Sequence, residues 1–390
     1  MPTTITGLTR KIAAAWAMRR LDAAARREHK NRTDSLHGTL EWLARAQDAT
    51  ADDGVSYGYG LADGWTVSYP ETTGYILQTF VWYHEIFGSD AVWERARRMA
   101  RWEVDIQMPS GATPGRFGTA RPVPVAFNTG QVLLGWAQYL RRENDTRVRD
   151  AAARAGRWLV ACMKDQPYFA DGVSAKAEHG DLSYNSMVSW GLAELGDVLG
   201  DASFVKAAQQ SARHYAELMD QHGWPYRAGF SDEDSQYPLT HNLGYTIQGL
   251  LETGRVVEDP TLGEVARTML DGARPMIDPR SGFLPGRIRP GWRGGSSWAC
   301  LTGSAQFACS YLRLVMMGHD KSGYAELASQ LVDYVVGTQV TGRQAAPEIA
   351  YGVRGSYPFR FGAYQPATLL NWAAKFFVDA LLMHQRLGRL

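Results

Sequence analysis

Cysteine, net charge and long apolar runs are all scarce in this sequence, and each scarcity removes a class of protein. The three cysteines are too few for a disulfide framework, and Cys162 and Cys309 fall on apolar helix faces, where we expect core residues. The net charge is only +1, and no basic run carries interleaved aromatics, so binding to nucleic acid is not expected. A membrane-spanning helix needs an apolar run of about 18 residues, and no run in this sequence is that long.

Sequence signatures of metal and cofactor sites are absent as well. No cysteine and histidine stand at a spacing typical of zinc sites. No glycine-rich loop for binding phosphate occurs, since the glycines fall at turns. We therefore expect a protein that uses no metal ion and no cofactor.

The N-terminal segment, residues 1–35, lacks the continuous apolar stretch and the cleavage site of a signal peptide. Basic residues are interleaved with apolar ones, which predicts a leading amphipathic basic helix packed on the outside of residues 36–390. Weak contact of this helix with a membrane surface is the alternative. Without a signal peptide, the expected location is the cytoplasm.

A short pattern that opens an apolar helix occurs six times along the chain. Measured at equivalent positions, it recurs every 56 to 64 residues. A repeat of this length is one supersecondary unit that cannot bury its own apolar face, so the units must pack against one another. The six equivalent positions are Gly74, Gly130, Ser186, Leu243, Gly303 and Ala367.

Each repeat is predicted to contain two helices joined by a long polar loop. In the third repeat, residues 147–163 carry apolar residues at helical spacing with charges between them, which is typical of a helix with one buried face. Residues 187–195 are apolar nearly all round, which is typical of a helix that is buried on every side. The first helix of each pair is therefore the outer one, and the second is the inner one.

Six such pairs predict an all-α (α/α)6 toroid, a six-hairpin barrel formed by a single domain over residues 36–390. The alternative is an open solenoid of helix pairs. Residues 369–377 argue against the solenoid, because the last inner helix is as apolar as the others and lacks the polar face of a terminal cap.

The long loops of such a ring lie together on one face, at the N-terminal ends of the inner helices. Unsatisfied backbone N–H groups there favour anionic groups. The loops are rich in aromatic residues, and flat amphipathic rings suit the apolar face and polar rim of a sugar. Some of these aromatics are expected only to pack the loops together. The substrate-binding candidates are Tyr57, Trp65, Tyr69, Trp298, Tyr357 and Tyr364.

Positive charge is concentrated in the last two loops, residues 279–298 and 341–365. They carry seven arginines against one acidic residue, Glu348. Because arginine forms paired hydrogen bonds with carboxylates, this favours an anionic substrate such as a uronic-acid glycan, and the alternative is ordinary solvated charge. The seven are Arg280, Arg287, Arg289, Arg293, Arg343, Arg354 and Arg360. The candidates for binding the substrate are Asn128, Asn185, Arg287, Arg293 and Arg360.

Three residues at the openings of inner helices are candidates for catalysis. Glu71 follows an aromatic-proline turn, Tyr184 opens the third inner helix and His241 opens the fourth. Elimination or C5-epimerisation of a uronate needs a base, a group that protonates the product and a group that stabilises the charge on the carboxylate. We therefore predict a lyase or epimerase with His241 and Tyr184 as proton-transfer groups. Glu71 is then an acid/base or an orienting carboxylate.

Two other functions stay open at this point. A glycoside hydrolase would use Glu71 as general acid and needs a second carboxylate across the scissile bond. The candidates for it are Asp181, Asp232 and Asp234, and nothing in the sequence selects one of them. A non-catalytic glycan-binding protein of exopolysaccharide assembly is the alternative from another class. The partner is a poly- or oligosaccharide in every case.

Four segments resemble six-hairpin proteins that are encoded in bacterial exopolysaccharide clusters. They are residues 68–75, 127–131, 298–306 and 371–377, which extend from the first repeat to the last. This resemblance implies the six-hairpin fold and says little about the reaction.

Two weaker resemblances are local. Residues 298–313 are similar to part of the C-terminal domain of glucuronyl C5-epimerases. Residues 71–75 resemble the acid-bearing segment of some (α/α)6 endoglucanases, which implies an acid role for Glu71. Those enzymes carry an aspartate on the next inner helix, where this sequence has Asn128 and Gln131, and this departure counts against hydrolysis.

Overall fold

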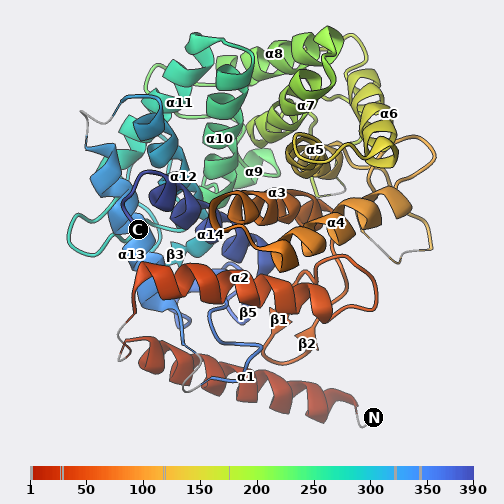
Figure 1. The fold of residues 1–390 in the computed structure, drawn as a ribbon. Coiled ribbons are helices and arrows are strands. Elements are labelled where there is room, and N and C mark those ends of the chain that lie inside the picture. The colour runs from red at the N-terminus through yellow and green to blue at the C-terminus, as the bar shows by residue number, and fades with distance from the viewer. Residues whose placement is uncertain are drawn as a thin grey trace.

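Within the described residues, six helical hairpins are arranged in a ring (Figure 1). The computed structural model describes residues 3–26, 28, 30–116, 118, 120–174, 176–319, 323–341 and 345–390. The outer helices are α2 (Arg32–Asp48), α4 (Asp90–Asp105), α6 (Thr146–Cys162), α8 (Ala202–Glu217), α11 (Pro260–Ala273) and α13 (Tyr324–Thr338). The inner helices are α3 (Pro70–Phe87), α5 (Ala126–Leu140), α7 (Ser186–Leu199), α10 (Thr240–Val256), α12 (Leu301–Met316) and α14 (Asn371–Arg386).

The inner helices form a closed ring. Proceeding along the chain, α3 packs against α5, α5 against α7, α7 against α10, α10 against α12, and α12 against α14. The last inner helix, α14, packs against the first, α3. This closure confirms the predicted (α/α)6 toroid and rules out an open solenoid, in which the first and last repeats would be far apart.

Burial separates inner helices from outer ones as the hydrophobic pattern predicts. Almost every residue of α5 is buried. On the outer helix α4, by contrast, only one stripe is buried, which consists of Ala96, Met99, Ala100, Trp102 and Glu103. Each outer helix therefore covers the ring with one face and turns the other to solvent.

Two small sheets join neighbouring repeats. In the first, β1 lies between β2 and β5 and is antiparallel to both, with Tyr59 opposite Leu369. Because β1 belongs to the first repeat and β5 to the last, this sheet reinforces the closure of the ring. In the second sheet β3 pairs with β4. The strands are β1 (Gly58–Gly60), β2 (Gly64–Trp65), β3 (Ala299–Cys300), β4 (Ser356–Tyr357) and β5 (Thr368–Leu370).

Small residues at the repeated positions let the inner helices approach closely. A Cβ atom on Gly74 of α3 would lie 2.5 Å from the Cα atom of Val132 in α5. A Cβ atom on Gly130 of α5 would lie 2.7 Å from the Cα atom of Val188 in α7. At these two positions the repeated sequence pattern thus marks close contacts between neighbouring inner helices.

The N-terminal helix α1 (Thr3–Ala25) lies outside the ring (Figure 1), where it contacts α13. Asp22 of α1 is buried and forms an ion pair with Arg354, which belongs to the loop before α14. Ile12 and Trp16 are exposed on the same helix. The ion pair fixes α1 to the ring.

The predicted boundary after residue 35 falls inside α2, which begins at Arg32. The division into an N-terminal helix and a barrel, and the contact of that helix with a membrane surface, stay predictions. In the part of the chain that is described, no helix is long and apolar enough to cross a membrane. Cys162 and Cys309 are free and buried, as the sequence predicts.

The close contact at Gly74 gives a first prediction. In Gly74→Ala the added methyl group meets the backbone of α5, so the variant should lose about 1–3 kcal/mol of unfolding free energy. Gly263→Ala is the matched control, because a Cβ atom on Gly263 of α11 has no neighbour within 4 Å. There the change should be neutral or stabilising by up to about 1 kcal/mol. Urea unfolding measures both, and equal effects of the two substitutions would contradict this account of the repeat.

Candidate functional site

The inner helices all begin on the same face of the ring, which we call the loop face, and end on the opposite face, the short-turn face. The long loops from outer to inner helices lie on the loop face, and turns such as residues 88–89 and 200–201 lie on the other. None of the six inner helices receives a hydrogen bond from the side chain of its N-cap residue. Five outer helices do, from Asn31, Ser89, Asp145, Asp201 and Asp259. The loop face therefore gathers helix N-termini that no N-cap side chain occupies.

The carboxyl group of Glu71 lies among tyrosines at the centre of the loop face. Tyr69 Oη donates a hydrogen bond of 2.9 Å to Glu71 Oε2. Burial raises the pKa of each of these tyrosines, and the charge of Glu71 raises it further. They come from the first, third, fourth and sixth repeats, so the ring brings distant parts of the chain to one carboxyl group. The tyrosines are Tyr57, Tyr69, Tyr75, Tyr184, Tyr245 and Tyr364.

Glu71 has the protonation behaviour of a general acid at neutral pH. Burial raises its pKa to about 7, and the hydrogen bond from Tyr69 and the charge of Lys176 only partly oppose this. A substantial fraction of the carboxyl groups is therefore protonated near pH 7. Lys176, from the loop before α7, was not among the candidates from the sequence.

His241 has the opposite shift. Burial lowers its pKa to about 4, and the hydrogen bond to Gln306 partly opposes this, so the imidazole is neutral at pH 7. Gln306 Nε2 donates to Gln248 Oε1 at 3.3 Å, which leaves Gln306 Oε1 facing His241 Nδ1 at 2.7 Å. An oxygen can only accept, so Nδ1 carries the hydrogen and Nε2 carries the lone pair.

Glu71 and His241 share two tyrosine neighbours. The His241 ring lies 4.3 Å from that of Tyr245 and 6.0 Å from that of Tyr364, measured between centroids. Burial is the largest cause of the raised pKa of both tyrosines, and the charge of Glu71 adds to it. A carboxyl group with a raised pKa and an imidazole with a lowered pKa therefore meet in one site, as is typical of acid–base catalysis.

Aromatic rings from α3, α5, α10 and α14 form the floor of this site. The Phe376 ring lies 5.5 Å from that of Tyr75 and 5.8 Å from that of Tyr245, and Tyr245 lies 5.1 Å from Phe127. Sequence reasoning missed these residues, although a signal was present. Two candidate positions have an aromatic partner four residues later, one helical turn deeper on the same face. The pairs are Glu71 with Tyr75 and His241 with Tyr245.

Tyr184, predicted as a proton-transfer group, precedes α7 in the short 3-10 helix η1 (Ser183–Asn185). Its ring packs edge-on against Phe127 and Phe230 at 5.2 and 5.4 Å. Burial raises the pKa of its phenol, and the charge of Glu71 adds to the shift. The phenol stays protonated at neutral pH, so it is suited to donating a hydrogen bond and unsuited to removing a proton.

Of the predicted aromatic residues, Tyr57, Tyr69 and Tyr364 belong to the central site and the others pack elsewhere. Trp65 lies against Trp42 of the outer helix α2, with ring centroids 5.3 Å apart. Trp298 is buried in a small cluster beside Tyr364. Tyr357 lies beneath Arg354 and next to Tyr334. The expectation that some loop aromatics only pack the loops together fits these contacts.

The predicted arginines do not surround Glu71. Arg287 forms an ion pair of 2.8 Å with Asp234, and Arg293 Nε donates to the carbonyl of Pro290. Arg360 lies over the ring of Phe361. Arg354 is paired with Asp22, as described above, and Arg343 lies outside the described residues.

Another arginine, Arg116 of the loop before α5, faces the site instead. Its charge lowers the pKa of Tyr57 and Tyr69, against the larger effect of burial. With Lys176 it supplies positive charge near Glu71. Neither residue stands in an arginine-rich stretch, so the charge pattern of the sequence did not identify them.

The two predicted asparagines hold loops in place. The side-chain nitrogen of Asn128 donates to the carbonyl of Pro114 at 3.1 Å, and that of Asn185 donates to the carbonyl of Gly180 at 2.9 Å. These bonds occupy the amide groups proposed to bind a substrate carboxylate. Their role in binding stays a prediction.

No second carboxylate acts on Glu71 within the described residues. The pKa of Glu71 responds to burial, Tyr69 and Lys176 alone. Each of the three predicted partners faces a basic residue of its own, namely Arg227 for Asp181, His179 for Asp232 and Arg287 for Asp234. In the described ranges, no group of three or more His, Cys, Asp or Glu residues is arranged to hold a metal ion.

Solved structures share this fold, although no protein-family model and no curated protein matches the sequence. An unsaturated glucuronyl hydrolase specific for heparin superposes with a TM-score of 0.73 at 13% identity, covering 92% of this chain and 98% of its own. The unsaturated glucuronyl hydrolase of Bacillus sp. GL1 gives 0.71 at 16%, with coverages of 92% and 98%. A protein described as a polysaccharide lyase gives 0.63 at 12%, with coverages of 92% and 99%. At these identities the likeness establishes the fold.

The raised pKa of Glu71 predicts a pH-dependent stability. Relative to an unfolded-state pKa near the ordinary 4.5, the stabilising contribution of this group is full below pH 4.5 and is lost as the pH rises through about 7. Glu71→Gln is neutral at every pH, so it should gain stability relative to the parent protein across this range, by about 3 kcal/mol at most. Urea unfolding at a series of pH values measures the difference.

Glu264→Gln is a suitable control, because the pKa of Glu264 is shifted in the opposite direction to that of Glu71. Glu264 lies on the outer helix α11, and the hydrogen bond from Arg267 lowers its pKa. Its contribution to stability is therefore present at neutral pH, and the substitution should give no gain as the pH rises. If the gap between the parent protein and Glu71→Gln stays constant over the whole pH range, Glu71 does not have the raised pKa described here.

Proposed function

We propose that this protein is an enzyme that acts on uronic-acid-containing oligosaccharides by acid–base chemistry centred on Glu71. The observation that carries the proposal is the position of Glu71 among tyrosines from four repeats, with a pKa of about 7 and a neutral imidazole close by. Such opposite shifts in one site are typical of catalytic groups and uncommon among groups that only stabilise a fold.

The surroundings of Glu71 suit a sugar ring. Tyr57 lies edge-on to Tyr69 and to Trp372, with centroids 5.5 and 4.5 Å apart, and Gln365 Nε2 donates to its hydroxyl at 3.1 Å. These rings offer apolar faces, while their hydroxyls offer hydrogen bonds to the rim of a sugar.

An acidic sugar is favoured over a neutral one by the local charge. Arg116 and Lys176 both act electrostatically on the site, and both are exposed, so they are accessible to a substrate. The helix N-termini at the loop face lack N-cap side-chain bonds and add partial positive charge. A uronate carboxylate at the mouth of the site meets attraction from all of these groups.

Hydrolysis of an unsaturated uronide fits a site with one acid. Ordinary glycoside hydrolysis needs a pair of carboxylates, and Glu71 has no such partner among the described residues. In a 4,5-unsaturated uronide the ring oxygen is conjugated with the C4–C5 double bond, so a single acid can protonate C4 while the ring oxygen stabilises the cation at C5. Two of the solved structures that share the fold are named unsaturated glucuronyl hydrolases.

The remaining steps need only the conjugate base of the same residue. Water adds at C5 and returns its proton to the Glu71 carboxylate. The resulting hemiketal opens to a ketone, and C1, now a hemiacetal, releases the attached sugar as an alcohol. In this proposal the neutral His241 and the phenols of Tyr69 and Tyr184 orient the water and the sugar by hydrogen bonds.

Proton abstraction by a lyase or epimerase is the second candidate. It is favoured by the lone pair on His241 Nε2, which is available as a base. Its strength is limited, because the pKa of His241 is about 4. Glu71 in its ionised form is the stronger base, so this reaction also depends on Glu71.

Turnover of defined substrates tests the proposal. The protein is incubated in D2O with an unsaturated uronyl disaccharide and, separately, with a saturated uronic-acid polymer. Hydrolysis of the disaccharide removes the ultraviolet absorbance of its conjugated double bond and places deuterium at C4. Elimination from the polymer creates that absorbance, and epimerisation places deuterium at C5 without cleavage. The proposed hydrolase gives only the first result.

Glu71→Gln should lower the rate by about 10²- to 10⁴-fold, because it removes the proton donor and keeps the shape. Asp232→Asn is the matched control on the same face, since Asp232 is exposed and does not act on Glu71, and it should keep full activity. Full activity of Glu71→Gln would place the chemistry elsewhere. Binding of uronic-acid sugars without any turnover would identify a non-catalytic glycan-binding protein instead.

A further inference from the structure

Ion pairs at the short-turn face link neighbouring inner helices with the spacing of the repeat. Arg142, just after α5, pairs with Glu85 of α3 at 2.9 Å. Arg141 pairs with Glu194 of α7 at 2.6 Å, and Arg255 of α10 pairs with the same carboxylate at 2.7 Å.

The chain of pairs continues around the ring. Arg313 of α12 pairs with Glu252 of α10 at 2.5 Å, and Arg386 of α14 pairs with Glu85 of α3 at 2.7 Å. Five of the six junctions between inner helices are thus bridged in the described residues. These cations lie at or near helix C-termini, where the dipole favours them.

The sixth junction, between α12 and α14, has an arginine on both sides. Here Arg313 and Arg386 stand where the other junctions have an arginine and a carboxylate. The acidic residue of α14 nearest in sequence to Arg386 is Asp379. Its carboxylate forms an ion pair with Lys375 at 2.6 Å and accepts a hydrogen bond from Thr79 at 2.7 Å. No carboxylate of the described residues bridges α12 and α14 here.

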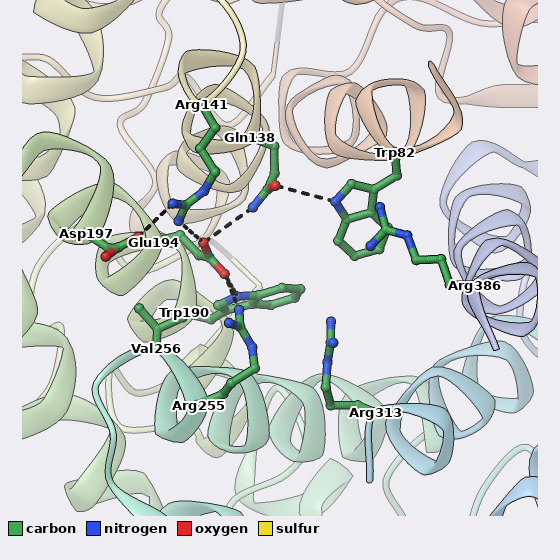
Figure 2. Close-up of a pocket in the computed structure, with 10 residues that line it drawn as sticks. All are labelled: Trp82, Gln138, Arg141, Trp190, Glu194, Asp197, Arg255, Val256, Arg313 and Arg386. Carbon is green, nitrogen blue, oxygen red and sulfur yellow. Dashed lines mark hydrogen bonds and ion pairs between the residues drawn. The ribbon is translucent and has the colours of Figure 1, made fainter. Parts of the chain in front are cut away.

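A cavity of about 330 Å³ opens beside this junction and is lined by residues from all six inner helices (Figure 2). Arg313 extends into it from α12, and Arg386 reaches across the ring of Trp82 at 5.3 Å. Trp190 lies on the side of Glu194, to which its indole nitrogen donates at 3.1 Å. The cavity has the size of a site for a small organic molecule.

The positive charge of the cavity is not fully compensated on the side of α12 and α14. Arg313 donates to Glu252 through Nε. Its terminal nitrogen Nη1 contacts the sulfur of Met316 at 3.6 Å, and a thioether sulfur is a weak acceptor. On the opposite side Arg141 and Arg255 already neutralise Glu194 and Asp197. One wall therefore offers donors to an anion, and the other offers the exposed carboxylate of Asp197 to hydroxyl groups.

We propose that this cavity binds a hydroxylated organic anion of monosaccharide size. Its carboxylate or phosphate group lies between Arg313 and Arg386 and completes the sixth junction of the ring. Its apolar surface lies against Trp82 and Trp190, and its hydroxyls donate to the exposed carboxylate of Asp197. The site is separate from Glu71, because it lies at the opposite ends of the inner helices.

The proposal is tested with sodium glucuronate, inorganic phosphate and glucose, each added alone. Isothermal titration calorimetry measures the affinity, and the NMR signals of the indole N–H groups of Trp82 and Trp190 show whether the ligand binds in this cavity. Glucuronate should bind and shift both indole signals, and glucose should shift neither. Phosphate binding as well would mean that the anionic group is sufficient, whereas binding of glucuronate alone would mean that a carboxylated sugar is required. Both results support the site.

Two variants keep the ring of ion pairs largely intact. Arg386→Gln leaves Glu85 paired with Arg142, and Arg313→Lys keeps a cation beside Glu252. Each should weaken glucuronate binding at this site by about 10- to 100-fold. Arg267→Gln on the outer helix α11, which removes the pairs with Glu264 and Asp271, is the matched control and should leave binding unchanged. Glu71→Gln should also leave it unchanged, which separates this site from the loop face.

The absence of indole shifts with both anions would overturn the proposal. So would unchanged binding in both Arg386→Gln and Arg313→Lys. Thermal unfolding of each variant without a ligand confirms that it is folded before its affinity is compared.

Discussion

The close approach of neighbouring inner helices is the constraint on which this structure depends. A methyl group at Gly74 or Gly130 would meet the backbone of the next helix, so these positions hold glycine and the inner helices pack almost backbone to backbone. Tight packing keeps the ring small enough for α14 to contact α3 and close it. Closure in turn brings residues as distant in sequence as Tyr57 and Tyr364 to one carboxyl group.

The closed ring also gives the molecule two chemically different faces. All inner helices run in the same direction, so their N-termini and their C-termini gather at opposite ends of the barrel. Helix dipoles favour anions at the first end and cations at the second. Glu71, in the first turn of α3, follows this tendency only in part, because burial keeps a large share of its carboxyl groups protonated. At the other end, the arginines near the C-termini of the inner helices follow the tendency directly.

A carboxyl group that is held partly protonated by burial carries a cost in stability at neutral pH, which is common at functional sites. The sequence identified Glu71, His241 and Tyr184 as candidates because they open inner helices after recurring turns. It assigned the proton transfer to His241 and Tyr184, whereas burial leaves His241 a weak base and keeps Tyr184 protonated. Their roles depend on the environment of each side chain, and hydrophobic periodicity does not report that environment.

The sequence by itself determined the helical hairpins, the distinction between inner and outer helices and the face on which the long loops lie. It could do so because each of these follows from local periodicity and from a repeat that cannot bury its apolar face alone. Only the tertiary structure decided which side chains meet. Arg287 pairs with Asp234, while Arg116 and Lys176 act on the tyrosines and on Glu71. Arg313 stands opposite Arg386 at a junction that no ion pair of the described residues bridges. Such encounters depend on loop paths and on distances between repeats, which are set by packing over the whole ring.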